Sequence, residues 1–533
     1  MPVRHAERDA RRLTVALSQA TAIFPSVDSR PSPHLSKSRF VAGWQCPKLL
    51  WWTVHEPGAT ELQPDTVLQD LFDQGRLVGE RAREEWPGGL LIEGGYRDPS
   101  RIPRTRAAIE AGAEVLFEAR FEQDAVFCSV DVLEKHPDGW TLIEVKSSTE
   151  VKDYHIPDLA VQTHVARRAG LVIRRIEVMH LSKAYRLGGE EPLFVRADVT
   201  DRVEAALLEV PGRIEEQLAV LRGDLPDTPV GPHCWYRDQE CAFTDRCWPE
   251  DRDHIRRLYR AGPTGAWQWM QQGVQRLEDI PAGAKLSDKQ RRQLRAVRED
   301  RLIVEPTLRA EIAPALAAER LGFLDFETVA RALPPWDGLG PWRATAAQFS
   351  YHERGPDGRV SHAEFLAEGP DEPGEAPDDP REPLARGMLE ATKDAGLVVV
   401  YTSFESSRIR ELAEFLPHLA EPLLALRAKL WDLHPVIVNH VYHPDFAGSF
   451  SLKKVLTPLV PDLGYDDLMI VDGRVASVEI ARLLFVSGRI PREQRDKTRR
   501  DLLDYCERDT FATVRLVKRL GELAGLPADR ARP

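Results

Sequence analysis

Four cysteines constrain the fold of this chain more than any other feature of its sequence. Cys46 stands near the start, in a Trp-Gln-Cys-Pro segment, and the others follow far downstream as Cys234, Cys241 and Cys247, in a C-x6-C-x5-C pattern. Four thiolates can hold a [4Fe–4S] cluster, one on each iron, or a single zinc ion. Either centre would bring two distant parts of the chain together and close a large loop between them.

The spacing of these cysteines favours an iron–sulfur cluster over zinc. Structural zinc sites are usually built from C-x2–4-C pairs, and gaps of six and five residues are wide for such a site. Unliganded thiols are the third alternative. Six cysteines among 533 residues do not form the framework of a disulfide-rich secreted protein, and local clustering in a reducing compartment favours metal binding. We expect the remaining two, Cys128 and Cys506, to be packed in the core.

The composition sets broad limits on partners and location. A chain of 533 residues predicts two or three domains. No apolar run approaches the roughly 18–20 residues of a membrane span, and residues 1–33 carry arginines without a long apolar stretch. We therefore expect a cytoplasmic protein without membrane contact, in which residues 1–33 form an N-terminal extension. The net charge of −12 argues against a broad nucleic-acid-coating surface but leaves room for a local basic groove.

Acidic residues and one lysine fall on or beside three predicted strands in the first half of the chain. Glu144 and Lys146 are two residues apart, so their side chains lie on the same face of a strand. Asp131 lies on the predicted hairpin partner, Glu118 on the strand before it, and Gln162 on the helix that follows. Two carboxylates can hold Mg²⁺ or Mn²⁺, which polarises a phosphate and activates water, and the lysine can stabilise the developing charge. An isolated E-x-K is more often a solvated strand face, so the neighbouring residues carry this prediction.

A second acidic set lies in the last third of the chain. Asp325 and Glu327 share one face of a strand, and Glu405 follows a buried strand. Tyr505 and Asp509 are four residues apart, on one face of a helix. Four acids from three segments can bind two metal ions ~4 Å apart. A lone D-x-E pair is usually a surface feature, but the other two segments favour a metal site.

These motifs resemble two nuclease families. The segments 129–131 and 143–148, together with Gln162, look like the motifs of the PD-(D/E)XK superfamily of RecB type. The cysteine frame is similar to that of CRISPR-associated RecB-like exonucleases, in which four cysteines hold a [4Fe–4S] cluster. The second acidic set resembles the DEDD exonucleases of the ribonuclease H-like fold, in the tyrosine form, with Glu405 where aspartate is usual.

The resemblances imply an α/β chain built from two nuclease-like domains. Residues 34–250 are expected to form a PD-(D/E)XK restriction-endonuclease-like domain with the cluster, and residues 311–533 a DEDD ribonuclease H-like α/β domain. Residues 251–310 would join them as a helical linker, with a helix-hairpin-helix turn or a solvated connector at 273–280. We expect a metal-dependent nuclease acting on DNA, on single strands or ends, in repair, recombination or defence. A nucleic-acid-binding protein with degenerate sites, or an RNA-processing exonuclease, is the alternative.

Overall fold

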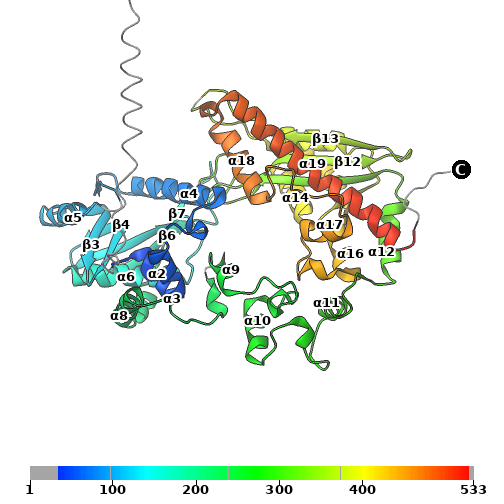
Figure 1. Cartoon of the computed structure of the whole chain (residues 1–533). Helices are drawn as coiled ribbons and strands as arrows, with labels where there is room; N and C mark the ends of the chain where they lie inside the picture. The colour runs from blue at the N-terminus through cyan, green and yellow to red at the C-terminus, as the bar shows by residue number, and fades with distance from the viewer. Residues whose placement is uncertain (1–33, 96–97, 237–238, 373, 527–533) are drawn as a thin grey trace, which may run out of the picture.

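The computed structural model describes residues 34–95, 98–236, 239–372 and 374–526 (Figure 1). It shows a mixed α/β protein with two large sheets, which confirms the predicted fold class. The predicted N-terminal extension, residues 1–33, lies outside the described residues. In the described part of the chain, every helix is too short or too polar to cross a bilayer.

The first sheet is formed by the N-terminal part of the chain. Its strand order is β2-β3-β4-β5-β6-β7, and β1 pairs with β4. Strands β3, β4 and β5 form an antiparallel meander, while β6 runs parallel to β5. The bounds are β1 (Leu35–Ser36), β2 (Leu90–Leu91), β3 (Val115–Gln123), β4 (Val126–His136), β5 (Gly139–Lys146), β6 (Ile173–Leu181) and β7 (Phe194–Asp198).

Helices cover this sheet and place polar groups at its centre. The crossover helix α6 (His155–Arg168) is buried along most of its length, because it packs between the sheet and α2. Helix α2 begins after Ser36, whose hydroxyl accepts a hydrogen bond from the Arg39 amide at 3.2 Å. Besides α6, the helices around this sheet are α2 (Lys37–Gln45), α3 (Pro47–His55), α4 (Thr66–Ala82), α5 (Arg101–Glu110), α7 (Thr200–Leu207) and α8 (Val210–Arg222).

Short strands and helices connect the two sheets. They include β8 (Trp235–Tyr236), β9 (Gln239–Glu240), α9 (Thr244–Cys247), α10 (Gly262–Gln271) and α11 (Asp288–Glu299). A small apolar core formed by Ile255, Leu258, Leu277 and Leu294 holds this region together. Residues 273–280 form a turn and a 3-10 helix between α10 and α11, and their assignment as a helix-hairpin-helix stays a prediction.

The second sheet has the strand order β13-β12-β11-β14-β15. Strand β11 is antiparallel to β12 and parallel to β14, and β15 is parallel to β14. The long helix α19 crosses one face of this sheet beside α18 (Figure 1). The bounds are β11 (Leu321–Val329), β12 (Thr345–Arg354), β13 (Val360–Leu366), β14 (Leu397–Val400), β15 (Leu430–Asp432), α18 (Gly473–Phe485) and α19 (Arg492–Leu523).

The remaining helices complete the layers around the second sheet. An apolar cluster on the face opposite α19 joins the sheet to three of them, α13 (Arg381–Ala391), α14 (Phe404–Phe415) and α15 (Ala420–Ala428). On the α19 side, a larger core includes residues of α12 (Leu308–Ala317), α16 (Leu433–His440) and α17 (Leu452–Leu459). The sheet is thus buried on both faces, so that polar groups at its centre are shielded from water.

The segment between β11 and β12, residues 330–344, contacts the first sheet and its helices. Arg331 forms an ion pair with Asp70 of α4 at 2.9 Å, and both side chains are largely buried. The indole nitrogen of Trp342 donates to the carbonyl oxygen of Ser147 at 2.6 Å. Helix α18 also packs against α4. The two sheets are therefore joined by direct contacts as well as by the connecting region.

Candidate active sites and metal centres

Glu144 is the centre of the first candidate site. Its carboxylate, at the end of β5, accepts hydrogen bonds from the amines of Lys146 and Lys37, both at 2.7 Å, and from the amide of Gln162 at 2.8 Å. Glu144 as a whole is only 2% exposed to solvent. Three of the residues predicted from the sequence, Glu144, Lys146 and Gln162, are thus brought together in one buried network.

Two further members of this network, Asp158 and Lys37, were not among the residues predicted from the sequence. Asp158 of α6 accepts from Lys146 at 2.8 Å and lies 3.6 Å from Lys37. It stands one helical turn before Gln162, a spacing that could have placed it on the same face. Lys37 comes from the start of α2, far away in sequence, and no local signal marks it. Burial works against charge on Lys146, but the carboxylates of Asp158 and Glu144 outweigh it and raise the lysine pKa.

Asp131 lies beside this network on β4. Its carboxylate accepts a hydrogen bond from the Val145 amide at 2.8 Å. Burial and the negative charge of Glu144 raise the pKa of Asp131 to about 7. Glu118, the other predicted ligand, forms an ion pair with Arg101 at 3.3 Å and is partly exposed. Asp131 and Glu144 are therefore neighbours, whereas Glu118 is turned toward an arginine.

The second candidate site is a buried carboxylate cluster. Strand β11 places Asp325 and Glu327 on the face covered by α19, and that helix supplies Asp509. One oxygen from each of these three carboxylates lies within 4.8 Å of the other two. Glu327 and Asp509 are 8% and 6% exposed. The sequence-predicted acids thus converge at a distance that one or two divalent cations can bridge.

Glu405 extends this cluster from the first turn of α14. It lines the same cavity of about 560 Å³ as Asp325, Glu327 and Asp509. Burial and the negative charge of Asp325 raise the pKa of Glu405 well above its usual value. Within the described residues, its Oε2 is a buried atom without a hydrogen-bond partner. An unpaired buried carboxylate oxygen facing other acids fits a metal ligand, because a cation would satisfy it.

Electrostatic repulsion dominates the cluster. Burial and the charge of Asp509 raise the pKa of Asp325 to about 7. Burial, Asp325 and Asp509 raise the pKa of Glu327 well above its usual value. Ionising all of these groups in a buried site is unfavourable unless a cation compensates them.

This repulsion predicts a pH dependence. Because the folded pKa of Asp325 lies above its unfolded value, the folded state binds more protons between about pH 4 and pH 7, and stability falls as pH rises through that window. In EDTA, wild type should lose more in Tm between about pH 5 and pH 8 than an Asp325→Asn variant, and added Mg²⁺ should shrink the difference. Differential scanning fluorimetry measures this, and equal losses in both proteins would contradict it.

Tyr505 lies beside the acids, one helical turn before Asp509 on α19. Its hydroxyl accepts a hydrogen bond from the amine of Lys453 at 3.2 Å. A second tyrosine, Tyr465, donates to Asp509, and the Lys453 amine lies 4.8 Å from the ring centroids of both tyrosines. Tyr465 lies in a loop without a motif, so nothing in the sequence indicated its place at the site.

A strained turn positions Glu405. Thr402, three residues earlier, has a φ of 90°, which a β-branched residue rarely adopts. The Asp432 carboxylate accepts hydrogen bonds at 2.9 Å from the amides of Thr402 and His434. Asp432 therefore stabilises the turn and caps α16, so that it acts on the site through Glu405.

The four predicted ligand cysteines surround one small cavity. Cys46 lies between α2 and α3, and Cys234, Cys241 and Cys247 come from the region of β8, β9 and α9. In the described part of the chain, no three of these sulfur atoms lie within 4.8 Å of one another. A single zinc ion with bonds of about 2.3 Å would hold them roughly 3.8 Å apart. The sulfurs therefore converge, but at a wider spacing than one zinc ion needs.

A histidine affects the thiols of this cavity. The Sγ of Cys234 lies 3.9 Å from Nε2 of His233. Burial opposes ionisation of Cys234, but the hydrogen bonds to its sulfur, with that of His233 the largest, and the charge of His233 together outweigh burial and lower the thiol pKa. Burial and the three other thiols raise the pKa of Cys241 to about 11.

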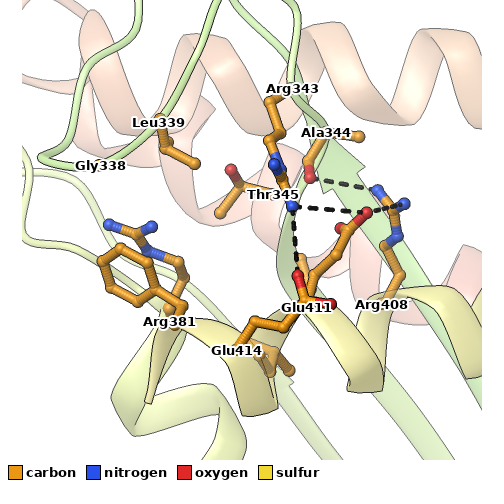
Figure 2. Close-up of a pocket in the computed structure, with 12 residues that line it drawn as sticks. Gly338, Leu339, Arg343, Ala344, Thr345, Arg381, Arg408, Glu411 and Glu414 are labelled. Atoms are coloured by element: carbon orange, nitrogen blue, oxygen red, sulfur yellow. Dashed lines mark hydrogen bonds and ion pairs between the residues drawn. The ribbon is translucent and has the colours of Figure 1, made fainter. Parts of the chain in front are cut away.

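Another cavity, of about 190 Å³, lies beside α14 (Figure 2). It is lined by several charged side chains, but each of its arginines pairs with a carboxylate, and the partner of Arg381 is Asp379, outside the lining. Arg408 donates to Glu411 at 2.9 Å, and Arg343 lies 4.0 Å from the same carboxylate. The cavity shares no lining residue with the carboxylate site. Because carboxylates neutralise its arginines, we assign this cavity no role in the reaction at the carboxylate site.

Among known proteins, the chain matches one family model and a solved nuclease structure. None of the curated proteins compared with this chain matches it. Among solved structures, an alkaline exonuclease (LHK-Exo) from Laribacter hongkongensis is 13% identical, with a TM-score of 0.22; the match covers 36% of this chain and 90% of that protein. A family model described as Domain of unknown function (DUF2779) matches residues 322–451. This match contains Asp325, Glu327 and Glu405 and ends before Tyr505 and Asp509.

Proposed function

We propose that the chain is a metal-dependent nuclease in which the carboxylate cluster of the second sheet is the principal active site. The observation that carries this proposal is the convergence of Asp325, Glu327 and Asp509 within 4.8 Å, in a cavity that all three line. Such a cluster is unfavourable without cations, and two cations bound by carboxylates are a common centre for phosphodiester hydrolysis.

Each group around the cavity has a distinct role in this proposal. The divalent metal ions would activate water and neutralise charge on the phosphate. Asp325 and Glu327 would hold these ions from β11, and Asp509 from α19. Tyr505 would orient the attacking water through its hydroxyl, whose position is held by the amine of Lys453. The same amine places a positive charge beside the acids, where it can attract a phosphate.

The topology of the second sheet supports a ribonuclease H-like domain over residues 311–533. Three antiparallel strands are followed by two parallel ones, in the order β13-β12-β11-β14-β15. Strand β11, the first of these strands in the chain, carries Asp325 and Glu327. Glu405 follows β14, and the C-terminal helix α19 supplies Tyr505 and Asp509. This placement is the one expected of a DEDD exonuclease in its tyrosine form.

We further propose that residues 34–250 form a second nuclease domain of PD-(D/E)XK type. The contacts among Glu144, Lys146 and Gln162, with Asp131 beside them, support it. A metal ion at this site would be held by Asp131 and Glu144. The Lys37 amine bonds to Glu144 at 2.7 Å, so metal binding would have to rearrange this contact. The carboxylates of the first site are therefore less available to a metal ion than those of the second site.

The four cysteines are proposed to hold a [4Fe–4S] cluster. A cluster offers each thiolate a separate iron, so its ligand sulfurs lie further apart than around one zinc ion. The lining of one small cavity by all four cysteines, together with their wide spacing in the sequence, supports the cluster. Bound there, it would join α2 and α3 to the region around α9.

The iron content of the protein tests this assignment. Anaerobically purified protein should be brown and contain about four irons per chain without stoichiometric zinc. Cys241→Ser should lose the iron and lower the Tm, because the cluster closes a long loop. Cys128→Ala, which alters a buried thiol outside the cavity, should retain the iron. Stoichiometric zinc in place of iron would contradict the assignment.

The nuclease proposal is tested with the full chain and labelled substrates. Single-stranded DNA, double-stranded DNA with different ends, and RNA are incubated with Mg²⁺ or Mn²⁺. We expect cleavage of DNA, with single strands or ends preferred, and none in EDTA. Preferential cleavage of RNA would favour the RNA-processing alternative. Tight binding without cleavage of any substrate would favour the nucleic-acid-binding alternative.

A further inference from the structure

A second set of metal-type ligands lies on the sheet of the carboxylate site but outside that site. It consists of His352 on β12, His362 on β13 and Glu507 on α19. The Nε2 atom of His352 lies 3.9 Å from Oε1 of Glu507, and Nδ1 of His362 lies 4.0 Å from the same oxygen. The two histidines are direct cross-strand partners, with ring centroids 4.5 Å apart. One nitrogen of each imidazole thus faces a shared carboxylate.

The opposite nitrogens of both imidazoles are held by hydroxyl groups. Nδ1 of His352 is 2.9 Å from Oγ1 of Thr510, and Nε2 of His362 is 2.9 Å from Oγ of Ser350. These two hydroxyls are hydrogen-bonded to each other at 2.7 Å. Metal-binding histidines nearly always have such an outer partner, because it fixes the ring orientation and the tautomer. The two rings are therefore oriented with their free nitrogens toward Glu507.

We propose that His352, His362 and Glu507 bind one divalent transition-metal ion of the zinc class. Two imidazoles and a carboxylate suit Zn²⁺, whereas Mg²⁺ prefers oxygen ligands and several waters. Bonds of about 2.0–2.2 Å in a tetrahedral site place ligand atoms roughly 3.3 Å apart. The observed separations of 3.9 and 4.0 Å require only small movements. Three protein ligands leave the fourth position to water.

The surroundings of His352 disfavour its charged form. His352 is 4% exposed, and burial together with His362 lowers its pKa to about 4. A neutral imidazole whose Nδ1 carries the proton toward Thr510 can hold a metal ion through Nε2.

The bound ion would join three elements of the sheet region. His352 and His362 belong to neighbouring strands, and Glu507 lies on α19 between Tyr505 and Asp509. Ser350, which supports His362, is the direct cross-strand partner of Asp325. The ion would therefore fix the position of α19 against the sheet, next to the carboxylate cluster. Its binding does not depend on the nuclease activity.

Zinc stoichiometry in the full chain tests the site. Wild type, His362→Gln and Glu507→Gln are stripped with EDTA, equilibrated with Zn²⁺, desalted and measured by elemental analysis. Both variants should bind one zinc fewer per chain than wild type. The cysteines and the four acids are present in all three proteins, so any metal held there cancels. His418→Gln is the matched control, because His418 also contacts a glutamate, Glu382, at 3.1 Å, and it should match wild type.

A supporting variant separates metal binding from a structural role of the histidines. Ser350→Ala leaves the three ligands in place but removes the partner of His362, so zinc affinity should fall by about 10–100-fold. Zn²⁺ should also raise the Tm of wild type more than that of His362→Gln. Because His362 is accessible to solvent, its substitution should leave the far-ultraviolet circular dichroism unchanged. Equal zinc content and equal Tm shifts in wild type and His362→Gln would overturn the proposal.

Discussion

Asp325→Asn should reduce Mg²⁺-dependent cleavage at the second site by at least about 100-fold, because bridging carboxylates supply several kcal/mol of metal-mediated stabilisation. The same substitution removes one charge from a mutually repulsive cluster. In EDTA the variant should therefore have a higher Tm than wild type, while its increase in Tm on adding Mg²⁺ should be smaller. Loss of activity together with a gain in metal-free stability identifies a residue that acts on metal rather than on folding.

The measurement is made in a Lys146→Met background, so that the first site does not contribute. Asp501→Asn is a matched control, because Asp501 lies on α19 and pairs with Lys497 at the surface at 2.6 Å. It should keep both the activity and the metal response. If Asp325→Asn cleaved at the rate of its parent, or if its metal response were unchanged, the carboxylate site would not be the active site.

Lys146→Met should strongly reduce cleavage by the first site, measured in the Asp325→Asn background. Lys146 bonds both Glu144 and Asp158, and its charge would stabilise the phosphate in the transition state. Losing a charged group of this kind typically lowers the rate by about 100–1,000-fold. Glu144 and Asp158 then lose one of the two lysine amines that neutralise them. Because an uncompensated buried charge is costly, the Tm of the protein should also fall.

Two further variants make this result interpretable. Lys135→Met changes an exposed lysine on the neighbouring strand β4 and should leave the rate unchanged. Lys37→Met removes the other amine on Glu144. If Lys37 competes with the metal, this variant should need less Mg²⁺ or Mn²⁺ for half-maximal activity. Residual cleavage that is identical with and without Lys146 would show that the first site is inactive.

Local patterns in the sequence were enough to identify most of both candidate sites. Two-residue spacing placed Glu144 beside Lys146 and Asp325 beside Glu327, and four-residue spacing placed Tyr505 beside Asp509. These relations follow directly from strand and helix periodicity. The α/β class followed from the resemblance of these motifs to two nuclease families.

Residues contributed by distant segments were harder to predict. Lys37 enters the first site from α2 because that helix packs against α6, and nothing near it in the sequence indicates this contact. Tyr465 reaches Asp509 from a loop, and His352 and His362 become neighbours only through the register of β12 and β13. Such contacts are set by tertiary packing, which a single sequence does not encode in any local period.

The segment between β11 and β12 has a consequence for dividing the protein into parts. It runs from the strand that bears Asp325 and Glu327 to the peptide next to Lys146, where Trp342, with a left-handed φ of 58°, donates to Ser147. A cut within residues 251–310 would divide the chain but leave the contacts of this segment with the first sheet and its helices intact. The halves made separately should therefore recognise each other in solution, and mixing them offers a route to reconstitute the two sites in trans.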